Sequence, residues 1–170
     1  MPWELTMVNY DGKPPRFRKD ADERRELPLG TLDEVRNHIS TVLPEIKWSV
    51  EPPLIEMMKA NGSNLWEDWD EEMKAAASIP KLQAVYYRAN LSIEMFGFEQ
   101  NGPLRFVLMD VRGSDNPIPI LRKLCEPRGW SFAEMSKDGE FLDLSGNDKR
   151  WDNWQHYLNY AIDQVQDSDE

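Results

Sequence analysis

The segment from Leu104 to Val111 constrains the fold more than any other part of the sequence, because it is apolar on both faces of a strand. Successive strand residues point to opposite sides of a sheet. One side would carry Leu104, Phe106 and Leu108, and the other Val107, Met109 and Val111. Strands buried on both faces lie in the interior of a sheet, so we predict a central strand here.

Two further strand-like segments precede this one, at Leu82 to Ala89 and at Leu91 to Phe98. Short turn sequences separate the segments, with Asn90 in the first gap and Gly102-Pro103 in the second. Strands joined by such short turns pair in the antiparallel sense. We therefore predict an antiparallel meander that ends at Arg112.

The N-terminal third of the chain alternates between strand and helix patterns. Residues from Trp3 to Val8 alternate between the two faces of a strand. Thr31 and Glu34 have the spacing of a capping box, which predicts the start of a helix that Pro44 ends. A second alternating run follows from Ile46 to Val50. Together these segments predict a β-α-β unit or a layer closely like it.

Helical periodicity recurs after residue 50. It predicts a short helix from Leu54 to Ala60, a second that Asn64 caps, and a third that begins at Pro117. We expect the apolar stripe of the second helix to face inward; it includes Leu65, Trp66, Trp69 and Met73. A final hairpin between Trp130 and Leu144 and a last amphipathic helix from about Asn147 complete the expected elements.

These elements predict an α+β fold in one domain, residues 1–170, with a mainly antiparallel sheet of five to seven strands and helices packed on one face. Two segments lie outside that plan. Residues 11–30 are dense in charges of both signs and contain Pro14-Pro15, which predicts a long mobile loop. Residues 163–170 predict a frayed acidic C-terminus.

The net charge of the chain is −11. Much of it lies between residues 134 and 170, which contain ten Asp and Glu residues but only three Lys and Arg residues. Such a field repels nucleic acid phosphates and anionic membranes and attracts basic molecules. We therefore expect a basic protein as partner, with neither nucleic acid nor a membrane; the oligomeric state is left open.

The cysteine usage indicates a reducing compartment. Cys125 is the single cysteine, so no internal disulfide forms, and no Cys/His cluster has the spacing of a zinc site. The N-terminus lacks a basic region followed by an apolar one, and no apolar run approaches the ~20 residues of a membrane span. We expect a cytoplasmic protein with no metal and no cofactor.

A candidate ligand site lies where the predicted central strand ends and a helix begins. It comprises Asp110, Arg112, Ser114, Asp115 and Asn116. Ligands collect at such strand ends, and a carboxylate inside an apolar strand has a raised pKa unless a cation pairs with it. The structural alternative is a strand end, a turn and a helix cap, with Asp110 paired to a neighbour.

A candidate partner surface lies on the predicted second helix, where Glu67, Asp68, Glu71 and Glu72 fall on the outward face. The alternative is a solvated acidic face without a partner. Tyr160 on the last helix is the aromatic residue of that helix that we expect to stay exposed, so it is added to the candidate contact residues.

No catalytic set is recognisable in the sequence. His38 and His156 lie outside any metalloprotease or triad pattern, and both are interpreted as surface or packing residues. Cys125 falls on the apolar stripe of its helix and is interpreted as a buried structural thiol. We expect no catalytic residues, and an enzyme is the less favoured class.

Several stretches together carry a resemblance. They are Pro28 to Ile39, Leu43-Pro44, Trp48-Ser49, Val111 to Gly113, Pro117 to Leu124, Gly129-Trp130 and Gly139 to Asp143. In these stretches the chain resembles small bacterial cytoplasmic proteins of unknown function. In size and charge it is similar to immunity proteins, which implies a basic partner and assigns no site residues.

Three hypotheses follow. The first is a non-enzymatic, immunity- or inhibitor-like binding module that presents its acidic surface to a basic protein. The second is a small enzyme or ligand-binding domain with a pocket near Asp110 to Asn116. The third is a structural domain without a small-molecule site.

Overall fold

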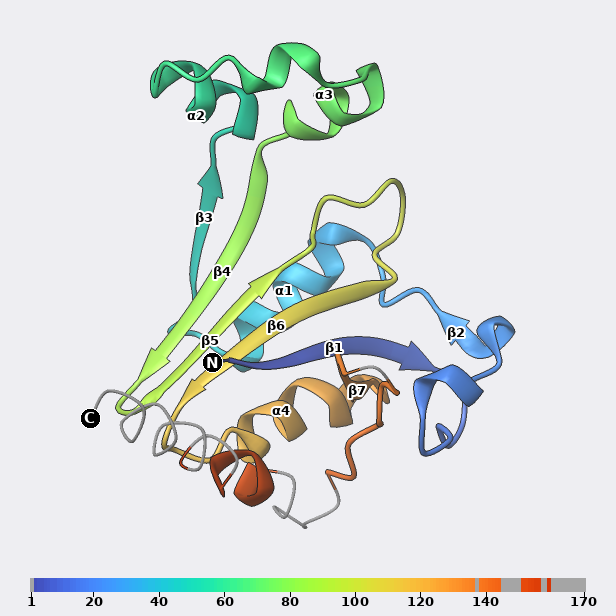
Figure 1. Cartoon of the computed structure of the whole chain (residues 1–170). Helices are drawn as coiled ribbons and strands as arrows, with labels where there is room; N and C mark the ends of the chain where they lie inside the picture. The colour runs from blue at the N-terminus through green and yellow to red at the C-terminus, as the bar shows by residue number, and fades with distance from the viewer. Residues whose placement is uncertain (1, 137, 145–150, 157–158, 160–170) are drawn as a thin grey trace, which may run out of the picture.

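Seven strands form one antiparallel sheet in the computed structural model, which describes residues 2–136, 138–144, 151–156 and 159 (Figure 1). The strand order is β2-β1-β6-β5-β4-β3, and β7 also pairs with β1. The strands are β1 Trp3–Tyr10, β2 Glu26–Leu27, β3 Lys47–Glu51, β4 Lys81–Arg88, β5 Leu91–Phe96, β6 Phe106–Gly113 and β7 Ser131–Glu134. The predicted α+β class and the mainly antiparallel sheet are confirmed.

The meander and its central strand are present. β4, β5 and β6 are consecutive neighbours, and β6 lies between β5 and β1. Met109 is directly opposite Met95 on one side and Leu5 on the other, and all three are fully buried. Phe106 and Leu108, on the other face of β6, are only partly buried. One face of this strand is therefore completely covered, and the other face is covered only in part.

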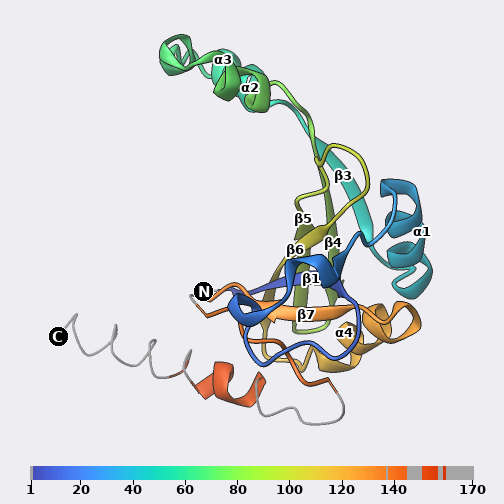
Figure 2. The ribbon, with the colours of Figure 1, turned by 90° about the vertical axis from the view of Figure 1, so that its right-hand side faces the viewer.

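The two helices α1 Leu32–Val42 and α4 Ile118–Cys125 cover the fully buried face. Ile39 of α1 and Leu121 of α4 belong to the same buried core as Leu5 and Met109, so both helices lie on that face of the sheet (Figure 2). Residues 151–156 are helical, and the Trp151 ring centroid lies 5.6 Å from that of Trp3 on β1. Apart from Asn159, the remainder of the predicted last helix lies outside the described residues, as do Tyr160 and the acidic terminus at 163–170.

The start of α1 has the predicted capping box. The Glu34 N–H donates to Thr31 Oγ1 at 3.2 Å, and the Thr31 N–H donates to Glu34 Oε2 at 2.8 Å. Two of the four unpaired N–H groups that every helix start exposes are thereby satisfied. The cap fixes where α1 begins and hence which of its residues face the sheet.

The predicted β-α-β unit is wrong in its pairing. The two predicted strands are β1 and β3, with the short strand β2 between β1 and α1 in the chain, yet β6, β5 and β4 separate β1 from β3 in the sheet. Sequence periodicity specifies which segments are strands, but pairing depends on contacts that are distant in the chain. The α1 connection thus carries the chain across the sheet to its far edge.

The expectation that all helices pack on one face does not describe α2 Leu54–Ala60 and α3 Glu71–Ala77. With the 3-10 turn η3 Leu65–Asp68, they form a lobe beyond the ends of β3 and β4, and the ribbon that carries it bends away from the side of α1 (Figure 2). Residues 52–80 are called the arm from here on. Pro52-Pro53 and Pro80 bound it, and proline does not continue either strand.

The continuous helix that was predicted after Asn64 is wrong. The helix is interrupted at Trp69, and Asp70 begins α3 anew by accepting the Met73 N–H at 2.8 Å. The interruption redirects the apolar stripe, so Leu65 and Met73 are exposed instead of inward. Asp70 favours a cap over a helix interior because its short side chain competes for nearby backbone N–H groups.

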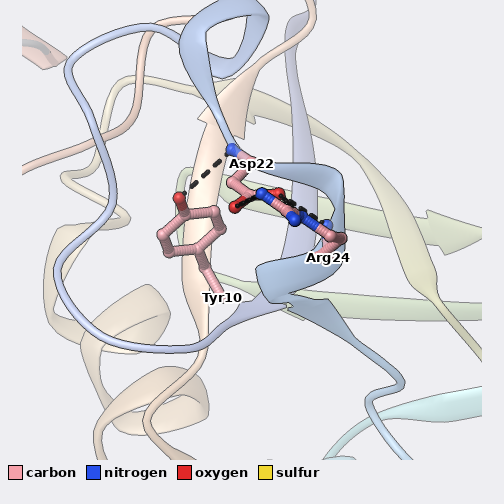
Figure 3. Close-up of polar contacts among 3 residues, drawn as sticks. All are labelled: Tyr10, Asp22 and Arg24. Atoms are coloured by element: carbon pink, nitrogen blue, oxygen red, sulfur yellow. Dashed lines mark hydrogen bonds and ion pairs between the residues drawn. The ribbon is translucent and has the colours of Figure 1, made fainter.

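The segment predicted as a mobile loop, residues 11–30, contains two 3-10 turns, η1 Arg18–Asp20 and η2 Glu23–Arg25. Asp22 caps η2 and binds the Arg24 guanidinium with both carboxylate oxygens, at 3.0 and 3.1 Å (Figure 3). The Asp22 N–H donates to the Tyr10 hydroxyl at 3.3 Å, which ties this turn to the end of β1. The hydrogen bonds from Arg24 lower the pKa of the Asp22 carboxyl.

The same segment contacts the chain after β7. The Arg18 N–H donates to the Gly139 carbonyl at 2.7 Å, and the Phe141 N–H donates to the Arg16 carbonyl at 2.9 Å. A second small core beneath these contacts joins Val8, Ala133 and Phe141. The mobility of residues 11–30 stays a prediction, and these contacts give the segment one defined path over the sheet.

Candidate functional site

Asp110 lies on β6 and faces away from α1 and α4, on what is called the open face of the sheet from here on. Because side chains alternate along a strand, Asp110 points to the same face as Thr6 and Leu108, and Met109 points to the other face. Its carboxylate is 3.5 Å from Nη2 of Arg112, two residues further along the same strand. The cation that was expected beside a buried Asp110 is therefore present.

Asp115 and Asn116 have structural partners. Asp115 Oδ2 accepts the Asn90 N–H at 3.1 Å, and Asn116 Oδ1 accepts the Ile118 N–H at 3.0 Å at the start of α4. Gly113 adopts φ +116°, and a Cβ at this position would overlap the Asn90 carbonyl. The loop after β6 is therefore closed against the β4–β5 turn, and two predicted ligand groups serve that closure.

A shallow depression of about 390 Å³ lies beside this loop on the open face. Its lining includes Arg112 and Ser114 from the predicted site and Tyr87 and Ser92 from the neighbouring strands. Asp110, Asp115 and Asn116 are not among the residues that line it. The structure thus brings two of the five predicted ligand residues to one concave surface, and ligand binding there stays a prediction.

A second depression, of about 530 Å³, lies over β1 and β6 with Thr6, Phe106 and Leu108 in its lining. Two charged lining residues are already paired with each other, because Lys19 Nζ lies 3.0 Å from Asp138 Oδ1. A ligand that uses either charge would first have to break that pair.

Three carboxylates stand in one row across the open face. The register places Glu4 on β1 directly opposite Asp110, and Glu94 on β5 directly opposite Asp110 from the other side. Directly opposed side chains have Cβ atoms about 4.5–5.5 Å apart, and like charges in that position destabilise a sheet. The row is missed by sequence reasoning, because Glu4 and Glu94 acquire their meaning only when the strand order and register are known.

Comparisons of this chain with protein-family models, curated proteins and solved structures found no match.

The predicted acidic partner residues all lie on the arm. All four are exposed, as predicted for an outward face: Glu67, Asp68, Glu71 and Glu72. Only Glu71 has a cation nearby, with Lys74 Nζ 3.7 Å from Oε1, among the ion pairs resolved in the described part of the chain. The arm holds six carboxylates against two lysines, so it is strongly negative.

The same arm exposes large apolar side chains. Leu65 is 68% and Met73 49% exposed, although both were expected to face inward. The five large apolar residues exposed on the arm are Leu54, Met57, Leu65, Met73 and Ile79. Exposed apolar and acidic side chains therefore occur together on one projecting lobe.

The arm has almost no core of its own. Ile55 and Ala77 are the only buried residues between positions 52 and 80, all of which the structure describes, and none of the arm belongs to the main core of the sheet. α2 and α3 have seven residues each, and helices that short are marginal in water without packing. Lys59 lies over the Trp66 ring at 4.5 Å, which gives one local contact within the lobe.

The remaining titratable candidates serve the core. His38 is buried between α1 and α4, and burial raises the pKa of the Cys125 thiol well above its usual range. In the ranges that the structure describes, no three Asp, Glu, His or Cys side chains form a metal-binding group. Among those same residues, none of the helices has the length and apolar character of a membrane span.

Proposed function

We propose that this chain is a non-enzymatic binding module that takes a basic protein partner on the arm. One observation carries the proposal: large apolar side chains and exposed carboxylates share a lobe that projects from the sheet and buries little of itself. Apolar anchors supply binding energy at protein interfaces, and surrounding charges supply orientation and rate.

The partner that fits this surface presents apolar side chains surrounded by Lys and Arg. Leu65 and Met73 would be covered on binding, while Glu67 and Glu72 would meet the basic groups. Methionine adapts its shape to different apolar surfaces, and Met57 and Met73 are both exposed here. Binding would also supply the packing that two seven-residue helices lack on their own.

The open face adds to the same field. The ribbon of β3 and β4 bends away from α1, so the arm and the row of Glu4, Asp110 and Glu94 lie on the same side of the sheet (Figure 2). Negative charge at both places attracts a basic partner and opposes nucleic acid. The proposal includes a reducing, cytoplasmic setting, because Cys125 is the only cysteine.

The test compares variants of the arm in affinity capture from native lysate at low and high salt. One variant changes Leu65→Ser and Met73→Ser; a second neutralises Glu67, Asp68, Glu71 and Glu72 to their amides. We expect wild type to retain a basic protein at low salt and to lose much of it at 1 M salt, where the Debye length is about 3 Å. Both variants should retain far less at low salt.

The matched control neutralises four exposed carboxylates away from the arm, at Asp11, Asp20, Glu45 and Glu99. It has the same net charge as the acidic arm variant. If the control loses the partner as completely as the arm variant does, overall charge and not the arm is responsible, and the proposal is wrong.

The depression beside Arg112 and Ser114 supports a second candidate, a ligand-binding domain. A ligand screen by thermal shift tests it, because a compound that binds the folded chain raises its melting temperature. The shift should disappear in Arg112→Ala, and a shift that persists would place the ligand elsewhere.

A further inference from the structure

β3 forms one edge of the sheet. It pairs with β4 along all five of its residues, and within the described part of the chain no strand pairs with its other side. Figure 1 shows no described segment beside it along that side. An edge strand presents a row of backbone N–H and C=O groups that another strand can use.

The charges of this edge are self-complementary. Lys47 and Glu51 are the first and last residues of β3, and Ser49 is midway between them. When two copies of the strand pair antiparallel around Ser49, Lys47 of each copy is opposite Glu51 of the other. Charges on edge strands usually prevent association, but this arrangement turns both of them into attractive cross-strand pairs.

The register around Ser49 is the one that uses the whole strand. It pairs all five residues of β3, whereas a shift by two residues in either direction leaves only three residues of each strand paired. A shift by one residue would put the helix layers of the two copies on opposite faces, because side chains alternate. In the register around Ser49, opposed residues point to the same face of the sheet. The helix layers of the two copies therefore lie on the same side of the joined sheet.

The side chains of β3 suit this pairing. Trp48 is held in place, since its Nε1 donates to Ser40 Oγ at 2.9 Å and its ring centroid lies 5.3 Å from that of Phe98. Val50, on the same face as Trp48, is 63% exposed. In the register around Ser49, Val50 of one copy is opposite Trp48 of the other, and its exposed surface is covered.

We propose that two copies of this chain associate through β3, antiparallel and centred on Ser49, so that their sheets become continuous. The two β3 strands run in opposite directions, so the arms leave from opposite ends and both stay accessible. Five paired residues bury little surface, which places the dimer in the weak class of interfaces below about 1,200 Å². The inference does not depend on the proposed function of the arm.

The test is sedimentation equilibrium of the full chain over a range of concentrations, with charge reversal at the two ends of β3. Lys47→Glu alone and Glu51→Lys alone each replace two attractive pairs by two repulsive ones, so each should weaken dimerisation about tenfold or more. A mixture of the two variants should restore association as a heterodimer, because each position 47 then faces a position 51 of opposite charge on the other chain. Lys13→Glu, at an exposed loop position, is the matched control and should dimerise like wild type.

Circular dichroism of each variant shows whether the monomer is folded, and the mixture controls for damage within one chain. Such damage matters because Glu51 is also opposite Lys81 in its own sheet. A wild-type chain that stays monomeric at every soluble concentration overturns the proposal. So does a dimer that survives either single reversal, or a mixture that fails to associate. Binding of a basic or acidic extended peptide by a chain that never dimerises would show that the edge serves another occupant.

Discussion

Nε2 of His38 lies 2.8 Å from the carbonyl oxygen of Leu124, and this hydrogen bond joins α1 to α4 inside the core. The carbonyl can only accept, so the ring nitrogen donates. The Trp130 ring meets the imidazole edge-on, with centroids 5.0 Å apart. A polar group that is buried needs such a partner, and here the partner also fixes how the two helices sit on the sheet.

His38→Ala should lower the free energy of unfolding by about 1–3 kcal/mol, because it leaves the Leu124 carbonyl without its donor. Urea denaturation followed by circular dichroism measures the change. His156→Ala is the control, since His156 is exposed, and it should change the free energy by less than about 0.5 kcal/mol. Equal effects of the two substitutions would show that the buried hydrogen bond does not stabilise the fold.

Gly113→Ala should lower the free energy of unfolding by at least about 3 kcal/mol, for two reasons. The new Cβ would overlap the Asn90 carbonyl, and alanine is strained at the positive φ of this position. Gly129→Ala separates the two causes. Gly129 has φ +65°, and a Cβ there would meet nothing within 4 Å. Gly129→Ala should therefore lower the free energy of unfolding by only the ~1–2 kcal/mol that a left-handed residue costs. If thermal or urea unfolding gives similar losses for both, the close approach of β6 to the β4–β5 turn is not a constraint.

The capping box of α1 should make stability depend on pH. Two hydrogen bonds with Thr31 lower the pKa of the Glu34 carboxyl. The larger effect comes from the backbone N–H of Thr31, and the smaller comes from its side chain. A lowered folded-state pKa means that the stabilisation is present above the unfolded pKa and is lost as pH falls through the folded one. The stability difference between wild type and Glu34→Gln should therefore shrink on acidification. Glu45→Gln, at an exposed position after α1, is the control, and a difference that grew on acidification would contradict the assignment.

Cys125 should be unreactive in the folded chain. Burial raises the pKa of its thiol, so it stays protonated at pH values where an ordinary cysteine, with a pKa of about 8.5, forms the reactive thiolate. Labelling with a thiol reagent should be slow between about pH 7 and 9 without urea, and fast and increasing with pH in urea. Equally fast labelling in both conditions would place the thiol at an accessible site.

Much of the fold follows from local patterns. The two apolar faces of Leu104 to Val111 predicted a central strand, and β6 is one. The spacing of Thr31 and Glu34 predicted a capping box, and both hydrogen bonds are present. Such features depend on neighbours within a few residues, so one sequence contains the information they need.

The rest depends on contacts that are distant in the chain. Leu65 and Met73 have the periodicity of a buried stripe, but Asp70 divides the helix and no sheet lies beneath it in the described structure. Glu4 and Glu94 stand beside Asp110 only because β1 and β5 both pair with β6. Periodicity reports that a residue shares a face with others, and tertiary pairing decides what that face meets.

We expect the arm to bind a partner and to be unnecessary for the fold. Glu51 and Lys81 are directly opposite each other in the sheet, so an Asn-Gly turn can replace residues 52–80 and close β3 and β4 as a hairpin. Since the arm contributes nothing to the main core, the shortened chain should fold with the circular dichroism of the sheet. Affinity capture with this variant is the most direct measurement. We expect a folded chain that no longer retains the basic partner, whereas a folded chain that retains it as wild type does would show that the partner binds elsewhere.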